Sequence, residues 1–351
     1  MKPTNMHDRL QRFDSGNMFA LLKEFPAQVR EAHRIASRTD CGSLNRGAIQ
    51  NVIVAGLGGS AIGGDILRDY LAPTMDVPVF VNRDYSLPAW VGESTLVFAC
   101  SYSGNTEETL AAFDEAREKR AQVVCLTSGG ELARAAADRG NVLINVPGGQ
   151  PPRTALGYMF LPMLVTLEKL GLVEDLEAEI EETLGLLERQ SGSFGEFDAE
   201  NEALRLAGEI RDRLPIIYSA REFLEAVNMR WRAQMEENSK VLAYGNVLPE
   251  MNHNEIMGWE RLPDVLERCA VIFLVSGDEH PQVRKRMSVT RELIEPYAGS
   301  VHSVHAEGES RLAKILGLIS YGDWVSFYAA ILNGVDPTPI AKIQALKASL
   351  K

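Results

Sequence analysis

The sequence contains few cysteines. There are four among 351 residues, namely Cys41, Cys100, Cys125 and Cys269. No two of them form a Cys-x-x-Cys pair, which excludes a zinc ribbon and a thioredoxin-type redox motif. Separated cysteines without a disulfide framework are typical of a reducing compartment. We therefore expect a cytosolic chain whose thiols are reduced and buried.

The sequence also lacks an excess of positive charge. It has 36 Lys and Arg residues against 48 Asp and Glu residues, which gives a formal net charge of −12. A nucleic-acid-binding protein needs a basic surface to replace phosphate counterions, so this composition argues against a nucleic-acid partner. It does not exclude a small anionic ligand, because a local pocket can oppose the total charge.

Long apolar runs are missing as well. The N-terminal segment 1–17, MKPTNMHDRLQRFDSGN, contains no apolar core of a secretory signal. No uninterrupted apolar run reaches the roughly 18 residues that a membrane-spanning helix needs. These absences predict a soluble, cytoplasmic protein with no membrane partner.

The remaining composition is that of an ordinary globular protein, with 45% hydrophobic and 24% charged residues. A soft prior of roughly 150 residues per domain predicts two domains. A chain of this length can bury a large core without disulfides or a structural metal.

Apolar runs of strand length alternate with amphipathic helical segments along the first half of the chain. This alternation predicts a parallel sheet that is covered by helices on both faces. The expected strands span residues 51–56, 77–82, 95–101, 121–128 and 141–147, and the expected helices span residues 17–38, 61–71, 105–120, 131–140 and 157–170.

A domain boundary is expected where the composition changes. Residues 171–200 are acidic, and residues 191–201 are rich in Ser, Gly and Asp, after a predicted helix over 174–190. A second alternation follows, which predicts an α/β fold of two domains, residues 1–190 and 191–351, each with a mostly parallel, doubly wound sheet. The later strands are expected at 214–219, 270–277 and 300–306, and the later helices at 222–238, 281–297 and 310–333.

The first candidate ligand-binding loop is GLGGSAIGGD, residues 56–65, which follows a predicted strand and opens a helix. Glycines let the backbone approach an anion, and a helix N-terminus offers free N–H groups. A ligand-free strand-to-helix turn has the same pattern. So does a dinucleotide fingerprint, which would use Gly56, Gly58 and Ala61 with Asp84 near the acidic position.

A second loop, SYSGNTEETL over residues 101–110, favours phosphate over these alternatives. Ser101, Ser103 and Thr106 place three hydroxyls around a glycine turn at a helix N-terminus. Hydroxyls and backbone N–H groups together can saturate the oxygens of a phosphate monoester. A dinucleotide site does not need a second loop of this kind.

These motifs resemble a known family. The Ser-x-Ser-Gly-x-Thr loop is similar to the phosphate loop of sugar isomerase (SIS) domains. GLGGSAIGGD, SYSGNTEET, PPRTALGY, ENSK, NHNE and DPTP…LK occur in this order over roughly residues 50–350. That series resembles the bifunctional phosphoglucose/phosphomannose isomerases of archaea and some bacteria. The resemblance implies two SIS-type domains and a sugar-phosphate site at Gly58, Gly59, Ser60, Ser101, Ser103 and Thr106.

The resemblance also implies a catalytic base and a cation. Arg153 in PPRTALGY matches the arginine that faces the reacting carbons, although a surface-loop arginine would fit the sequence alone. Glu236 and Glu237 lie near the C-terminal end of a predicted helix, where the helix dipole disfavours carboxylates. A broken local rule can mark function, although solvated acids are the simpler interpretation. The family's base matches the second glutamate, Glu237.

His253 in the NHNE loop matches the family's ring-opening histidine, which the neighbouring subunit supplies, so the resemblance implies a homodimer. Lys347 matches the lysine of the family's final helix better than Lys342 does. His302 and His305 alternate along a predicted strand without a carboxylate at ligand spacing, so we interpret them as structural and expect no metal site.

The implied activity is reversible aldose–ketose isomerisation of hexose 6-phosphates through an enediol(ate), without a redox cofactor or metal. Several alternatives remain: an isomerase of one epimer only, an isomerase of another sugar phosphate, a non-catalytic sugar-phosphate regulator and a dinucleotide enzyme. A regulator would carry a basic helix-turn-helix, and none is evident. A glutamine-dependent aminosugar synthase would need Cys near residue 2, whereas the chain starts MKPTN. The second domain has GDEHPQVRKRM in place of a hydroxyl-rich loop, so we expect one phosphate site per chain.

Overall fold

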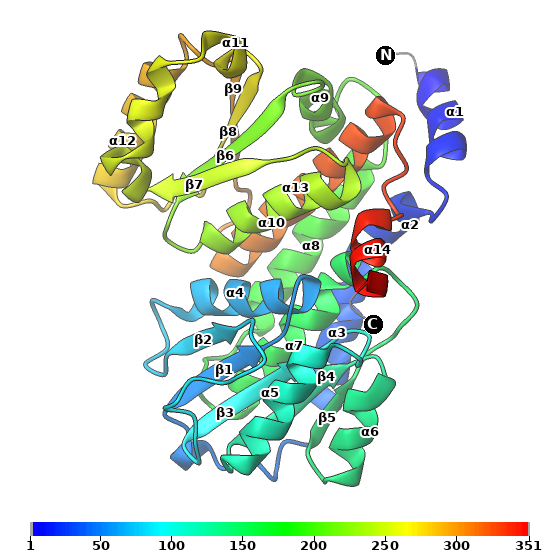
Figure 1. The fold of residues 1–351 in the computed structure, drawn as a ribbon, viewed down its shortest axis with the longest axis vertical. Helices are drawn as coiled ribbons and strands as arrows, with labels where there is room; N and C mark the ends of the chain where they lie inside the picture. The colour runs from blue at the N-terminus through cyan, green and yellow to red at the C-terminus, as the bar shows by residue number, and fades with distance from the viewer. Residues whose placement is uncertain (1–2, 350–351) are drawn as a thin grey trace. The chain divides into compact units, whose positions relative to one another are not determined.

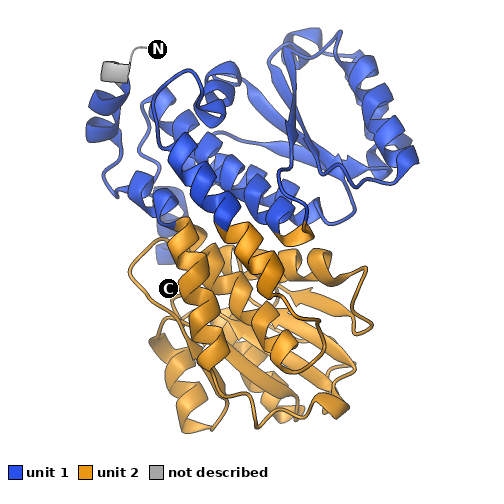
Figure 2. Cartoon of the chain, turned by 180° about the vertical axis from the view of Figure 1, so that it is seen from behind, with its two compact units in different colours: residues 1–24, 185–309, 313–351 blue, residues 25–184, 310–312 orange. Residues whose placement is uncertain are grey.

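The computed structural model describes residues 3–349, which form two compact units (Figure 2). We call residues 25–184 with 310–312 the first-sheet unit. The described residues within 1–24, 185–309 and 313–351 form the second-sheet unit. The first helices of the chain therefore group with the second sheet.

The first-sheet unit contains a five-stranded parallel sheet with the order β2-β1-β3-β4-β5 (Figure 1). The central strands β1 and β3 are almost entirely buried because helices cover both faces of the sheet. On one face, Phe113 of α5 and Leu132 of α6 join a core with Ile53 and Val97. The strands are β1 (Asn51–Ala55), β2 (Val79–Asn82), β3 (Thr95–Cys100), β4 (Gln122–Thr127) and β5 (Val142–Asn145), and the helices are α3 (Phe25–Arg38), η1 (Arg46–Ala48), α4 (Gly59–Leu71), α5 (Glu107–Glu118), α6 (Gly130–Asp138), η2 (Pro152–Thr154) and α7 (Leu156–Lys169).

The second-sheet unit contains a four-stranded parallel sheet with the order β7-β6-β8-β9. This order repeats β2-β1-β3-β4 of the first sheet element by element, so the α/β fold with two parallel sheets is confirmed. Its strands are β6 (Leu214–Ala220), β7 (Tyr244–Leu248), β8 (Cys269–Val275) and β9 (Ser300–His305), and its main helices are α9 (Glu202–Glu209), α10 (Glu225–Asn238) and α12 (Pro281–Ile294). The remaining helices are α1 (Pro3–Phe13), α2 (Met18–Lys23), α8 (Glu177–Phe194), η3 (Glu250–His253), η4 (Glu255–Glu260), α11 (Pro263–Leu266), α13 (Arg311–Asn333) and α14 (Ala341–Ser349).

The predicted strands and the observed ones agree within two residues at each end, but some elements differ. The helix expected over 17–38 is two helices, α2 and α3, because Pro26 has no N–H to continue the hydrogen bonding of α2. The helix expected over 174–190 continues to Phe194, so part of the expected linker is helical. Strand β7 and the helices α1 and α9 were not expected, whereas α14 is the final helix that the resemblance implied for Lys347.

Helix α13 bears on the expectation that no segment is apolar enough to span a membrane. By length and composition alone its 23 residues could span a membrane, but 94% of an apolar 18-residue stretch within it is buried in the protein. Inside the second-sheet unit, Trp324 stacks on Tyr328 with ring centroids 5.7 Å apart. Burial of this extent is typical of a core helix.

Candidate active site

The turn between β1 and α4 is shaped by two adjacent glycines. Gly58, the residue before the helix, has φ 52° and ψ −124°, a conformation that side chains disfavour. Gly59 is limited by space instead, because a Cβ there would lie 2.9 Å from the carbonyl oxygen of Pro152. The turn therefore leaves the N-terminus of α4 open on one side and lies against the Arg153 loop on the other.

The turn between β3 and α5 brings two of its three hydroxyls together. The Oγ of buried Ser101 lies 2.9 Å from the Oγ1 of Thr106, and it also accepts a hydrogen bond of 3.1 Å from the N–H of Gly104. Ser103 is exposed, and its hydroxyl accepts from the N–H of Asn105 at 3.3 Å. Thr106 is the N-cap residue of α5.

The two turns form one structure, which we call the anion cradle (residues 56–60 and 101–106). Strands β1 and β3 are neighbours, and the strand order of the sheet reverses between them. In open α/β sheets such a reversal opens a crevice at the carboxyl ends of the strands, where ligands bind. Two helix N-termini meet there, and their N–H groups and dipoles favour an anion. The structure thus brings all six predicted phosphate-binding residues to one edge of the first sheet.

Arg153 lies beside the anion cradle. Arg153 is a buried residue of η2. The backbone of η2, at Pro152 and Arg153, lies against Gly59. Gln28 of α3 fixes this loop, because its Nε2 donates to the carbonyl of Thr154 at 2.8 Å and its Oε1 accepts from the N–H of Gly157 at 2.7 Å. The sequence pattern of the predicted helix gave no signal for Gln28, which is a polar residue on a buried helical face.

Glu237 belongs to the second-sheet unit, near the C-terminal end of α10. Glu237 is half-buried, whereas Glu236 is exposed. The Lys240 ammonium donates to the backbone carbonyls of Glu237 and Pro337, the latter at 3.1 Å. This amine therefore joins the ENSK segment to the DPTP turn, two of the motifs on which the resemblance depends.

A buried polar network holds α10 against α13. The Arg230 guanidinium donates to the Asp323 carboxylate at 3.1 and 2.6 Å, and Gln234 adds a bond of 2.9 Å to the same carboxylate. One turn later, the amide of Asn238 donates to the hydroxyl of Ser326 at 2.9 Å. Burial raises the pKa of Asp323, and the Arg230 guanidinium opposes that rise. The network therefore holds α10 on both sides of Glu237, at Gln234 and at Asn238.

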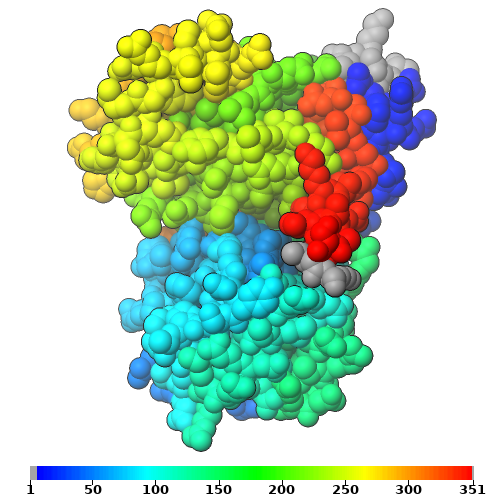
Figure 3. Space-filling model, viewed as in Figure 1, coloured from blue at the N-terminus to red at the C-terminus, as the bar shows by residue number. Residues whose placement is uncertain are grey.

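The other two predicted catalytic residues are exposed. His253 is the last residue of η3, in a loop whose neighbouring Asn252 donates to the Thr290 hydroxyl at 2.8 Å. Lys347 lies on α14, which Figure 3 shows in red on the outside of the molecule, and residues 341–349 are all exposed. Lys342 shares this helix and its exposure, so the structure does not favour either lysine. The roles of both His253 and Lys347 stay predictions.

The second sheet has a turn at the position equivalent to the β3–α5 turn, but a carboxylate fills it. The buried Glu279 side chain accepts hydrogen bonds from the backbone N–H and the hydroxyl of Ser276, the latter at 2.8 Å, and from the N–H of Gly277 at 3.1 Å. These are the donors that a phosphate would need. The turn is therefore already occupied by an anion from the chain itself.

The four cysteines and His302 lie in buried or half-buried surroundings. All four cysteines are free and buried, and burial raises the pKa of the Cys125 thiol to about 12. Among residues 3–349 no cluster of three or more His, Cys, Asp or Glu side chains is arranged to hold a metal ion. His302 lies with its Nδ1 3.3 Å from the Glu209 carboxylate.

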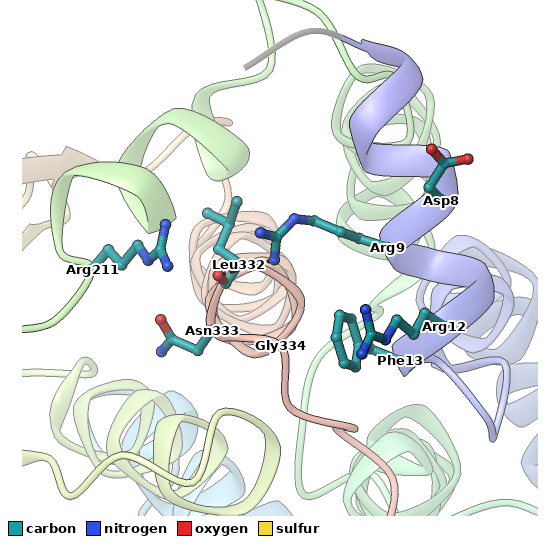
Figure 4. Close-up of a pocket in the computed structure, with 8 residues that line it drawn as sticks. All are labelled: Asp8, Arg9, Arg12, Phe13, Arg211, Leu332, Asn333 and Gly334. Carbon is teal, nitrogen blue, oxygen red and sulfur yellow. Dashed lines mark hydrogen bonds between the residues drawn. The ribbon is translucent and has the colours of Figure 1, made fainter.

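A cavity of about 350 Å³ in the second-sheet unit lies apart from the predicted residues. Arg9, Arg12 and Arg211 line it, at the end of α13 (Figure 4). The Arg9 guanidinium donates to the carbonyls of Ile331 and Leu332 at 3.0 and 3.2 Å. A cation is favourable at a helix C-terminus, so Arg9 has a structural role there.

Comparison with known proteins covers both units. Residues 48–157 match the SIS domain family, and residues 199–350 match the bacterial phospho-glucose isomerase C-terminal SIS domain. A bifunctional phosphoglucose/phosphomannose isomerase of Caldicellulosiruptor bescii is 42% identical over 95% of this chain and 98% of its own. One of the same description from Aquifex aeolicus is 35% identical over 86% and 91%. A solved structure of a hypothetical protein from Thermus thermophilus has a TM-score of 0.74 at 15% identity, over 99% of this chain and 93% of its own, which shows the shared fold.

Proposed function

This chain belongs to the family of bifunctional phosphoglucose/phosphomannose isomerases, and on that premise we propose that it interconverts glucose 6-phosphate and mannose 6-phosphate with fructose 6-phosphate. It is an aldose–ketose isomerase by this relationship. The observation that carries the proposal is the anion cradle, where two turns and two helix N-termini converge at the carboxyl edge of the first sheet.

The cradle suits the phosphate group of the substrate. From the first turn, Gly58 and Gly59 would contribute backbone N–H groups and Ser60 its hydroxyl. The second turn would add the hydroxyls of Ser101, Ser103 and Thr106. Phosphate binding far from the reacting carbons fixes those carbons against the catalytic groups, so that binding energy lowers the barrier through orientation.

The remaining predicted residues would carry out the proton transfers. His253, with Lys347, would move the proton of the anomeric hydroxyl to the ring oxygen, which opens the ring. Glu237 would then remove the proton from C2 of the aldose, or from C1 of the ketose, and return it to the neighbouring carbon. The negative charge that develops on the enediolate oxygens in between would be stabilised by Arg153.

One intermediate serves both epimers. Glucose 6-phosphate and mannose 6-phosphate differ only at C2, and that carbon becomes planar in the enediolate. Reprotonation from one face or the other gives the two aldoses. A pocket that permits rotation about C2–C3 lets a single base produce both.

We also propose a homodimer that shares its active sites, with His253 of each chain acting in the site of its partner. Mixing tests this arrangement directly: Glu237→Gln and His253→Ala proteins would each be inactive, and co-refolded mixtures would regain up to about a quarter of wild-type activity. Mixtures without activity would contradict shared sites. We place the enzyme in the cytoplasm, among the hexose phosphate reactions of glycolysis and gluconeogenesis.

The activity itself is tested with fructose 6-phosphate as the only substrate. Glucose 6-phosphate and mannose 6-phosphate are measured separately with coupled dehydrogenases, and the proposal predicts both. Formation of glucose 6-phosphate alone would restrict the enzyme to one epimer. Formation of neither, with tight phosphosugar binding, would indicate a sensor or an isomerase of another sugar phosphate.

A further inference from the structure

Three side chains of the second sheet hold the carboxylate of Glu255, two residues beyond His253. The Tyr218 hydroxyl donates to its Oε1. The hydroxyl of Tyr244 and the amide Nδ2 of Asn246 donate to its Oε2, at 3.1 and 2.7 Å. We call Glu255 with these three donors the carboxylate clamp.

The register of the sheet explains why these donors meet. Tyr218 of β6 lies directly opposite Asn246 of β7, and Tyr244 precedes Asn246 by two residues. Residues two apart on a strand point to the same face, so all three side chains lie on one face of the β6–β7 pair. The tyrosines stay protonated donors, because burial and the Glu255 charge both raise their pKa.

A further hydrogen bond, from Trp259, supports the carboxylate clamp. The buried indole of Trp259 donates to the Tyr218 hydroxyl at 3.1 Å, so the loop contacts the same tyrosine twice, through Glu255 and through Trp259. Before His253, the Asn252 amide bonds Thr290 of α12 at 2.8 Å. The exposed histidine therefore stands between two anchored residues, 252 and 255.

We propose that Glu255 is a positioning residue, whose carboxylate fixes the 250–260 loop on β6 and β7 and thereby sets His253 for ring opening. This inference rests on the proposed function of His253. A loop that bears an acid–base group must hold it within a fraction of an ångström, and a displacement of about 1 Å can cost around a hundredfold in rate. Half-buried Glu255 lies two residues from His253, and its carboxylate accepts three side-chain hydrogen bonds from β6 and β7, so it is the group that supplies this restraint.

The clamp is tested by a reaction that needs ring opening but no isomerisation. The protein-catalysed exchange between the α and β anomers of glucose 6-phosphate is measured by exchange NMR. Binding of 5-phosphoarabinonate, an open-chain analogue of the enediolate, reports on the rest of the site. Glu255→Gln should slow the anomer exchange at least about tenfold while the Kd of the aldonate stays within about twofold.

Matched variants separate positioning from general damage. Glu260→Gln changes an exposed carboxylate of the same loop and should behave as wild type. Tyr244→Phe removes one donor at an exposed position, so it should slow anomer exchange severalfold and decides the matter if Glu255→Gln does not fold.

The outcomes distinguish this inference from the proposed function. If His253→Ala does not slow anomer exchange, the role of His253 and the role of the clamp both fail. If His253→Ala slows it and Glu255→Gln does not, only the clamp fails. Parallel losses of anomer exchange and aldonate binding in Glu255→Gln would also overturn it, because Glu255 would then support the whole site and not His253.

Discussion

The hydroxyl of Ser60 accepts a hydrogen bond of 3.1 Å from the backbone N–H of Tyr102. Ser60 lies in the first turn of α4 and Tyr102 in the turn after β3, so this bond joins the two parts of the anion cradle. Both residues are buried. The cradle is therefore preorganised, and a bound phosphate would not have to assemble it.

Removing two hydroxyls of the second turn of the cradle should weaken binding without unfolding the protein. Ser103 is exposed and Thr106 half-exposed, so Ser103→Ala with Thr106→Ala removes little packing. A hydrogen bond to a charged group contributes about 1.5–3 kcal/mol, which predicts a rise of at least about tenfold in the Kd of fructose 6-phosphate. Calorimetric titration measures it. As a control, Ser86→Ala changes an exposed serine outside both turns and should leave the Kd unchanged. An unchanged Kd in the double variant would show that this turn does not bind the phosphate.

A methyl group at position 59 should disturb the Arg153 loop. The Cβ of Gly59→Ala would lie 2.9 Å from the Pro152 carbonyl and 3.3 Å from the N–H nitrogen of Arg153, so the backbone must shift. We expect kcat/KM to fall by about 10- to 100-fold, because small displacements of catalytic groups are costly. Steady-state assays test this. Gly92→Ala, where a Cβ has no neighbour within 4 Å, should be silent, and equal activity in both variants would refute the close approach.

Each chain should bind one phosphosugar, because Glu279 occupies the equivalent turn of the second sheet. Titration calorimetry should give one site per chain. Glu279→Ala should lower the melting temperature, since unsatisfied buried N–H groups cost about 1–3 kcal/mol. Inorganic phosphate should then raise the melting temperature of the variant by more than it raises that of the wild type. A wild-type stoichiometry of two, or a variant that gains nothing from phosphate, would count against this interpretation of the turn.

His302 should affect acid stability and not activity. Burial lowers its pKa, more than the Glu209 carboxylate raises it. A lowered folded-state pKa means that the unfolded chain binds the proton better, so the stability is present above about pH 6.5 and is lost as the pH falls through the folded-state value. Urea unfolding at pH 8 and pH 5 should show a smaller loss for His302→Gln than for wild type. An equal loss, or reduced isomerisation at pH 8, would contradict a purely structural role.

The sequence predicted those parts of the fold that depend on local patterns. Strands β1, β3 and β4 are continuous apolar runs, because helices bury both faces of the sheet. Strand β7 was missed because it is an edge strand with a glycine and an asparagine, and most of it is only half-buried or exposed. Its stabilising partner is β6, which no local pattern reveals.

The site divides in the same way. The glycine and hydroxyl spacing predicted the cradle because adjacent parallel strands bring their carboxyl ends together. Gln28, Glu255 and Glu279 were missed, since each acts through partners that are far away in the sequence or are backbone groups. The sequence showed only that the second domain lacks a hydroxyl-rich loop. The structure identifies Glu279 as the carboxylate that fills the equivalent turn, where a bound phosphate would otherwise lie.

The central claim is that one carboxylate, Glu237, transfers the proton for both epimers. The most direct test follows glucose 6-phosphate and mannose 6-phosphate formation from fructose 6-phosphate in Glu237→Gln, with Glu236→Gln as the neighbouring control. A positioned base contributes about 10²–10⁴-fold, so both rates should fall by that much and by the same factor, while 5-phosphoarabinonate still binds and the control stays active. Full activity in Glu237→Gln, or loss of one product alone, would contradict a single shared base.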